Sequence, residues 1–243
     1  MQISRRAILG GSVLLPMAGL APLRAWATED ESKQITPAKA LQNLRDGNGS
    51  FVLGNRLPYR IDKDYRQELA KGQLPYASII CCSDSRAAPE QIFQAGLGQL
   101  FVVRNAGTSI ANPQALGSIE YSVHEWAVPL IVVLGHTKCG AVKEAVKIVK
   151  SNAVFPPTLE ALLLPLLPAV LATREENVED WIDKAVRENV RRIARTLRSC
   201  DQPILYPPQR TGKLKVVGAV YDLKEGVVDF FDMPPPIPPC AKT

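Results

Sequence analysis

Three short apolar runs constrain the fold of this chain more than any other feature. They span Tyr76–Cys82, Leu100–Val103 and Leu130–Leu134. Runs this short that stay apolar are typical of strands buried on both faces of a sheet. Segments of helical character, Pro89–Gln94 and Pro113–Trp126, separate them. This alternation predicts an α/β fold with a central, mainly parallel β-sheet flanked by helices.

Helices are also predicted before and after the three apolar runs in the chain. Thr36 as N-cap, Pro37 in the first turn and Gly47 as the stop indicate an N-terminal helix. Residues 62–71 form a second polar helical segment, and a further helix is predicted over residues 139–150.

The C-terminal part is predicted to be a helical arm followed by a hairpin. The arm spans residues 151–199, and two prolines interrupt its Leu-rich first half, which argues against a membrane span in the mature chain. Its second half, Val178–Leu197, is amphipathic, with acidic residues first and arginines last, as the helix dipole favours. A Lys-Glu-Gly turn between two apolar runs predicts a C-terminal hairpin over residues 214–231.

Residues 1–27 are predicted to be a cleaved secretory signal. Arg5 and Arg6 precede an apolar stretch, and Ala25-Trp26-Ala27 provides a cleavage site of small residues. The start resembles the twin-arginine export signal of bacteria, a receptor-read address for folded proteins; an ordinary secretory signal is the alternative. We therefore expect an exported protein, in the periplasm or in a thylakoid lumen if the source has one. The domain then spans residues 28–233, with a proline-rich, disordered tail over 234–243.

Charge argues against one class of function. The chain has a formal net charge of +5, but the predicted signal holds three arginines and no acidic residue, so the remainder has 26 basic and 24 acidic residues, a charge of +2. Lysines and arginines are dispersed among the acidic residues. Nucleic-acid-binding proteins concentrate positive charge on one face, so we predict no nucleic-acid partner.

The segment CCSDSR, residues 81–86, carries a thiol, a carboxylate and a guanidinium at alternate positions. Neighbouring side chains of a strand point to opposite faces. Cys82, Asp84 and Arg86 therefore share one face if the extended conformation continues. Cys81 then points to the other face, as a core residue.

The segment GHTKCG, residues 135–140, supplies a histidine and a second thiol. His136 and Cys139 follow a predicted strand, and Cys139 lies near the start of a predicted helix, a position that lowers the pKa of a thiol. Both segments leave the C-terminal ends of strands, where sites of such sheets lie. With Cys82 these residues make three zinc ligands and leave one position open, the catalytic pattern. A Cys82–Cys139 disulfide is the alternative; export after cytoplasmic folding argues against it, because metal can load first.

Three motifs together resemble those of the β-class carbonic anhydrases: CSDSR at 82–86, RNAG at 104–107 and GHTKCG at 135–140. The resemblance extends from about Ala40 to Phe231. It implies a zinc enzyme that interconverts CO₂ and bicarbonate. It also implies a homodimer or a higher multiple, with pocket residues partly from the partner.

The resemblance assigns roles to the residues of these motifs. It implies that Cys82, His136 and Cys139 bind zinc. Asp84 would accept a hydrogen bond from zinc-bound hydroxide, and in some members of the family this Asp occupies the fourth zinc position. Arg86 would keep Asp84 ionised and away from the metal.

Further residues match family positions outside the ligand set. Gln73 would donate to bicarbonate, Phe101 and Tyr121 would line the apolar substrate pocket, and Gly140 follows the last ligand. For Phe101 and Tyr121 an ordinary core position is the alternative, and for Gln73 a surface loop.

One departure concerns bicarbonate regulation. Some bacterial members have a non-catalytic bicarbonate site that uses a Trp three residues before the first ligand, together with an Arg and a Tyr. Arg104 and Tyr221 match the last two, but Ile79 stands at the Trp position. Bicarbonate inhibition by this route is therefore not implied.

The expected reaction is attack of zinc-bound hydroxide on the carbon of CO₂, because zinc lowers the pKa of bound water from ~15.7 to roughly 7. Two thiolate ligands donate more charge than imidazoles and should make the zinc a weaker acid. Two alternatives stay open: a related hydrolase of COS or CS₂ on the same zinc site, and a zinc-binding module without turnover. The Asp84–Arg86 pair favours catalysis, because a structural zinc site does not need it.

Three residues remain outside these assignments. His124 is the only other histidine, and we expect it on an ordinary helix face, with proton transfer to buffer as the alternative. Cys200 and Cys240 are expected to be free thiols, with a disulfide between them outside a reducing compartment as the alternative.

Overall fold

The computed structural model describes residues 35–55, 60–199 and 201–234, which belong to one compact unit. The predicted signal, Cys200, Cys240 and nearly all of the proline-rich tail lie outside the described residues.

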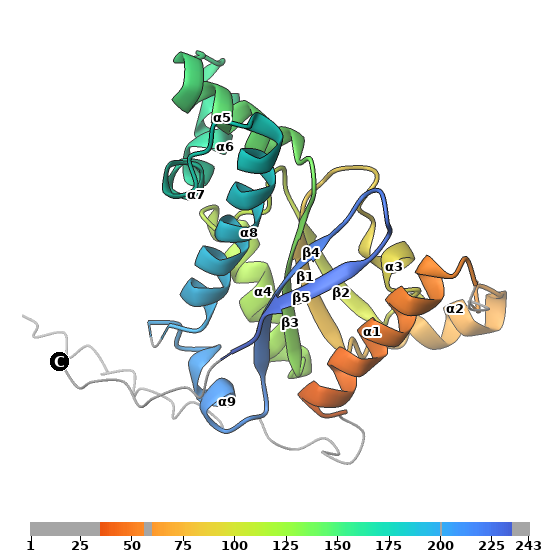
Figure 1. The fold of residues 1–243 in the computed structure, drawn as a ribbon. Helices are drawn as coiled ribbons and strands as arrows, with labels where there is room; N and C mark the ends of the chain where they lie inside the picture. The colour runs from red at the N-terminus through yellow and green to blue at the C-terminus, as the bar shows by residue number, and fades with distance from the viewer. Residues whose placement is uncertain (1–34, 56–59, 200, 235–243) are drawn as a thin grey trace, which may run out of the picture. The chain divides into compact units, whose positions relative to one another are not determined.

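A five-stranded sheet forms the centre of this unit (Figure 1). Its strands, in the spatial order β2-β1-β3-β4-β5, are β1 (Ala77–Cys81), β2 (Leu100–Arg104), β3 (Leu130–His136), β4 (Lys215–Tyr221) and β5 (Val228–Asp232). The pairs β1–β2, β1–β3 and β3–β4 are parallel, and β4–β5 is antiparallel. The predicted α/β class, the mainly parallel sheet and the C-terminal hairpin are confirmed.

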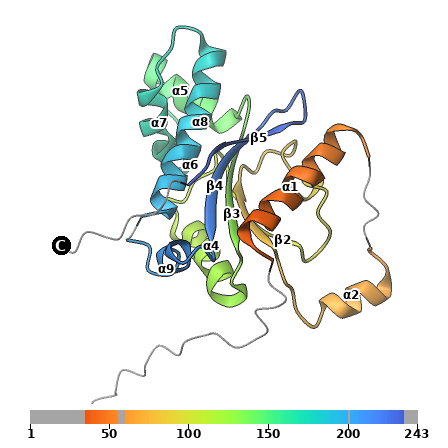
Figure 2. The ribbon, with the colours of Figure 1, turned by 60° about the horizontal axis from the view of Figure 1, so that its bottom comes forward.

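Helices flank the sheet on both faces (Figures 1 and 2). They are α1 (Pro37–Val52), α2 (Lys63–Leu69), α3 (Pro89–Ile92), α4 (Pro113–Trp126), α5 (Gly140–Ser151), α6 (Pro157–Leu163), the 3₁₀ turn η1 (Leu164–Leu166), α7 (Leu167–Ala172), α8 (Val178–Leu197) and α9 (Tyr206–Arg210). Helices α4, α5 and α8 bury apolar residues against one face, and α1 and α3 against the other. The predicted helical arm comprises α6, η1, α7 and α8.

The side chains of β1 point alternately into the two apolar cores, one on each face of the sheet, as expected for a strand. Ile80 and Cys82 face the core under α4, α5 and α8, whereas Ile79 and Cys81 face the core under α1 and α3. Cys81 is 1% exposed and is a core residue, as predicted, and burial raises its pKa to about 12.

Helix α1 begins as predicted but does not end there. The side chain of Thr36 caps it by accepting from the Lys39 N–H, and Pro37 occupies the first turn. The prediction of Gly47 as the stop is wrong, because the helix continues to Val52. Gly47 instead allows a close approach to α3, since a Cβ there would lie 1.9 Å from the carbonyl oxygen of Phe93.

Helix α8 lies close to the C-terminal end of β3. A Cβ on Gly135 would lie 2.6 Å from Val186 Cγ1 and 2.9 Å from Val190 Cγ2. The missing side chain therefore lets α8 approach the strand next to His136.

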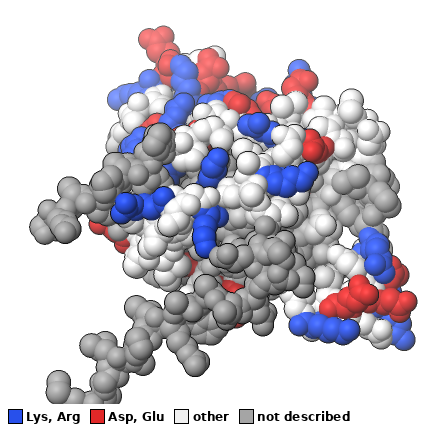
Figure 3. Space-filling model, turned by 90° about the horizontal axis from the view of Figure 1, so that it is seen from below, with Lys and Arg blue, Asp and Glu red and all other residues white. Residues whose placement is uncertain are grey.

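One face of the molecule carries charges of both signs (Figure 3). On the face shown in Figure 3, basic and acidic side chains are both present, with wide uncharged areas between them. In the described part of the chain, no helix combines the length and the apolar character needed to cross a membrane.

Candidate metal centre

The topology brings the two predicted ligand segments to the same end of the sheet, at the C-terminal ends of β1 and β3. Strands β1 and β3 are parallel neighbours, with Cys81 opposite Leu134. Cys82 follows β1 directly, and His136 is the last residue of β3. Cys139 follows in the same loop and is the N-cap residue of α5.

The three side chains form one buried cluster. Their candidate ligand atoms all lie within 4.8 Å of one another, and the Cys82 and Cys139 sulfurs are 3.9 Å apart. Cys82, His136 and Cys139 are 5%, 1% and 2% exposed. All three are thus withdrawn from bulk solvent.

The imidazole is oriented for metal binding. His136 Nδ1 lies 2.9 Å from the backbone oxygen of Thr137, which places the proton on Nδ1. Nε2 is then an acceptor, and it is buried without a hydrogen-bond partner among the described residues. A buried acceptor beside two thiols is a donor set that suits zinc, so the residues present fit the metal that the motifs predict.

The Cys82 and Cys139 thiols do not ionise independently, because their sulfurs are in contact. The contact with Cys139 lowers the pKa of Cys82, with help from the Gly107 N–H, while the same contact and burial raise the pKa of Cys139. The backbone N–H groups of Ala141 and Val142 at the helix terminus do lower the pKa of Cys139, as predicted. The neighbouring Cys82 thiolate and burial outweigh the backbone N–H groups at the start of α5.

The alternative of a Cys82–Cys139 disulfide does not hold in this structure. Both residues are free cysteines, and their 3.9 Å separation is far beyond an S–S bond of roughly 2.05 Å.

Asp84 and Arg86 lie beside the cluster and form a salt bridge with two side-chain hydrogen bonds. Arg86 Nε is 2.9 Å from Asp84 Oδ1 and Arg86 Nη2 is 2.7 Å from Asp84 Oδ2. Asp84 Oδ2 is also 3.9 Å from His136 Nε2, which places the carboxylate beside the cluster. The hydrogen bonds from Arg86 hold the pKa of Asp84 well below its usual range.

The extended conformation does not continue through this segment. Strand β1 ends at Cys81, and the Ala87 N–H donates to the Asp84 carbonyl at 3.0 Å, which closes a turn. The Arg86 N–H also donates to Asp84 Oδ1 at 3.0 Å. Asp84 and Arg86 meet through this turn rather than through strand alternation.

Contacts from other segments hold the first ligand in place. The Gly107 N–H lies 3.4 Å from Cys82 Sγ. Arg104 donates to the carbonyl oxygens of Cys82 at 2.9 Å and Asp84 at 2.6 Å. The motif RNAG signals this segment, but the sequence does not reveal that its backbone N–H reaches the thiol.

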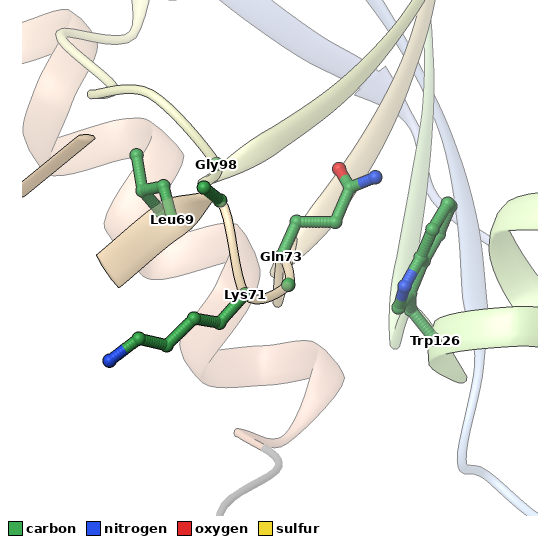
Figure 4. Close-up of a pocket in the computed structure, with 7 residues that line it drawn as sticks. Leu69, Lys71, Gln73, Gly98 and Trp126 are labelled. Atoms are coloured by element: carbon green, nitrogen blue, oxygen red, sulfur yellow. The ribbon is translucent and has the colours of Figure 1, made fainter. Parts of the chain in front are cut away.

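Three of the predicted substrate residues, Gln73, Phe101 and Tyr121, lie outside the ligand cluster. Figure 4 shows the Gln73 side chain extending toward Trp126, and both line one open pocket. Phe101 of β2 and Tyr121 of α4 contact Trp126, with ring centroids 5.4 and 5.1 Å away. The three candidate ligands lie outside both this pocket and this aromatic cluster. Tyr121 is 48% exposed, so the core alternative does not apply to it.

Other singled-out residues have simpler places. Gly140 is exposed at the start of α5, with no atom within 4 Å of a Cβ built on it. His124 is exposed on α4. Ile79 and Tyr221 are both buried in the core under α1 and α3, and Tyr221 packs near Phe51 at a ring distance of 6.4 Å.

Comparisons with known proteins agree with this geometry. A family model described as carbonic anhydrase matches residues 77–228. Carbonic anhydrase 2 of Mycobacterium tuberculosis is 37% identical over 193 residues, covering 78% of this chain and 90% of that protein. The solved β-carbonic anhydrase CcaA is 31% identical with a TM-score of 0.60, covering 79% of this chain and 91% of that one. The chain belongs to the β-class carbonic anhydrases. The resemblance drawn from the motifs is thus confirmed for the family, the fold and the activity.

A further solved relative extends the likeness to the fungi. A tetrameric β-carbonic anhydrase of Sordaria macrospora has a TM-score of 0.62 at 25% identity, covering 80% of this chain and 94% of that one. The matched region of the family, residues 77–228, contains the three candidate ligands, Asp84 and Arg86.

Proposed function

We propose that this carbonic anhydrase is a zinc enzyme whose metal is held by Cys82, His136 and Cys139. The observation that carries the proposal is a buried cluster in which a ring nitrogen of His136 and both sulfurs lie within 4.8 Å of one another, with the His136 Nε2 left without a hydrogen-bond partner. A zinc ion there would act as a Lewis acid that lowers the pKa of a bound water, so that hydroxide is available to attack CO₂ at neutral pH.

Asp84 directs the nucleophile in this proposal. Its carboxylate is ionised and can only accept hydrogen bonds, so it orients an O–H group beside the metal and rejects molecules that cannot donate. Arg86 occupies both carboxylate oxygens, which keeps Asp84 from turning toward the metal.

We further propose that the active enzyme is a homodimer or a higher multiple. Strand β2 is at the edge of the sheet, and Gln73, Phe101, Tyr121 and Trp126 form an open surface next to it. Helix α2 buries no residue in this subunit. These features suit a surface that a second copy covers, with Phe101 and Tyr121 lining the partner's pocket for CO₂ and bicarbonate.

The buried apolar surroundings and the Asp84–Arg86 pair favour turnover over a zinc-binding module without catalysis. Hydrolysis of COS or CS₂ would use the same site, and assays of CO₂, COS and CS₂ with one enzyme preparation distinguish these substrates.

One experiment tests the metal and the activity together. Mature protein is analysed for zinc and assayed for CO₂ hydration by stopped flow, next to Cys82→Ser and Cys81→Ser. We expect one zinc per chain and activity in the parent and in Cys81→Ser, and loss of both in Cys82→Ser. Cys81 is the matched control because it is the adjacent buried thiol on the opposite face of β1. Full zinc occupancy in Cys82→Ser would contradict the proposed ligand set.

We also propose export through the twin-arginine route, on the basis of Arg5, Arg6 and Ala25-Trp26-Ala27. The destination is the periplasm, or a thylakoid lumen if the source has one. Cell fractionation of the variant with Arg5→Lys and Arg6→Lys should find folded precursor in the cytoplasm; normal export would contradict this proposal.

A further inference from the structure

We infer that helix α8 positions two loops of the metal centre and thereby sets its affinity for zinc. Asn189 holds the Gly107–Thr108 loop, which contacts Cys82, and Asp183 holds the loop that carries His136 and Cys139. The inference rests on the zinc site proposed above. Neither residue is a candidate ligand, so both act through other groups.

Asn189 fastens the loop that reaches the first ligand. Its Nδ2 donates to the Gly107 carbonyl at 3.1 Å and to the Thr108 carbonyl at 2.9 Å. It is only 6% exposed, so both hydrogen bonds are made away from solvent. The N–H of the same Gly107 points at Cys82 Sγ at 3.4 Å.

This loop needs to be held because its backbone is strained. Gly107 has φ +83°, which glycine adopts without strain, but Thr108 has φ +59°, which is unfavourable for a β-branched residue. Such conformations persist only where surrounding contacts impose them. Asn189 is one of the contacts that impose this one, since it bonds to the carbonyls of Gly107 and Thr108.

Asp183 fastens the other loop in the same manner. Its Oδ1 accepts from the Lys138 N–H at 2.8 Å, and Lys138 also has a positive φ, +55°. Lys138 lies between His136 and Cys139, so the contact fixes the turn that carries both ligands. One helix therefore holds two strained turns, one behind each part of the ligand set.

A hydrogen bond to a thiolate alters its charge donation to a metal, and partners behind the ligands typically change metal affinity by about 10–100-fold. Loss of Asn189 should free Gly107 and remove its N–H from Cys82. The expected result is weaker zinc binding and a changed thiolate environment, rather than a loss of stability alone.

The test compares Asn189→Leu with Asn48→Leu in the full chain. Asn48 is also 6% exposed and also donates to two backbone carbonyls, those of Ile92 and Gly226, in the core on the other side of the sheet. Zinc affinity is measured by chelator competition, and the thiolate environment by the sulfur-to-metal charge-transfer bands of cobalt-substituted protein. We expect at least ~10-fold weaker zinc binding and shifted bands for Asn189→Leu. Asn48→Leu should lose stability but keep parent affinity and bands.

Asp183→Ala provides a second variant at a half-buried position, in case Asn189→Leu does not fold. It should weaken zinc binding by a similar factor. Parent affinity and parent bands in the folded variants would overturn the inference, as would equal changes in Asn48→Leu. A parent protein that binds no zinc would instead overturn the proposed function, so the two failures are distinguishable.

Discussion

At the scale of single residues, the chemistry depends on the charge state of Asp84. Three hydrogen bonds from Arg86 stabilise its carboxylate, so its pKa lies below the ordinary value of 3.8. A lowered pKa means that this stabilisation is present above the ordinary pKa and is lost only as pH falls through the lowered one. Asp84 is therefore an acceptor at every neutral or mildly acidic pH, and its protonation does not limit activity there.

Asp84→Asn tests this role directly. The amide keeps the shape, but it can donate a hydrogen bond and loses the charge partner of Arg86. We expect retained fold and zinc but at least ~10²-fold lower kcat/KM, the range for removal of one preorganised group. The matched control is Asp229→Asn, which breaks the 2.6 Å ion pair with Arg187 away from the ligands and should keep parent kcat/KM. Near-normal CO₂ hydration by Asp84→Asn would reduce the carboxylate to an ion-pair partner.

At the scale of elements, Gly47 and Gly49 of α1 have very different surroundings although they are only two residues apart. Gly47 is buried, and a Cβ there would meet the Phe93 backbone carbonyl at 1.9 Å. Gly49 is exposed, and a Cβ there would have no neighbour within 4 Å. The first glycine permits α1 to pack on α3, whereas the second only weakens the helix.

Alanine at each position should therefore change stability in opposite directions. Gly47→Ala should lower the free energy of unfolding by about 1–3 kcal/mol or more, because a backbone carbonyl cannot yield as a side chain can. Gly49→Ala should raise it by about 0.4–1 kcal/mol, because the unfolded chain loses conformational freedom. Urea denaturation of both variants measures the difference. Equal effects would show that α1 and α3 are not in close contact.

At the scale of the whole molecule, the two edges of the sheet differ. The β2 edge lies beside the aromatic residues Phe101, Tyr121 and Trp126, whereas β5 packs on α8, with Phe231 beneath the guanidinium groups of Arg187 and Arg191. The β2 edge is thus the better candidate for covering by a second copy.

Introducing a charge at each edge tests this difference. Tyr121 is 48% exposed and Val227, beside β5, is 45% exposed. Tyr121→Glu should weaken the dimer by at least ~10-fold and lower CO₂ hydration with it, because a carboxylate would be buried without a partner. Val227→Glu should leave both unchanged. Light scattering over a concentration series gives the mass, and an unchanged dimer in Tyr121→Glu would exclude this surface.

The sequence by itself determined those features of the fold and of the site that depend on residues close together in the chain. The strands could be predicted from short apolar runs, and the start of α1 from Thr36 and Pro37. Because the strands before CCSDSR and GHTKCG are parallel, the two motifs were also expected at the same end of the sheet. The residues 206–210 of α9 escaped this reasoning, because two prolines in a short segment obscure a helical pattern.

Tertiary structure alone decided the rest, because the contacts join residues far apart in the chain. Asn189 interrupts an otherwise apolar stripe of α8, a signal of a buried polar role, but its partner Gly107 lies 82 residues away. Gly47 is a helix stop by local rules and a packing site only once α3 is beside it. Gln73 and Tyr121 match family positions, yet folding places them apart from the ligands of their own subunit. Local hydrogen bonds and periodicity act within a few residues, whereas the position of a loop depends on which distant backbone groups it can satisfy.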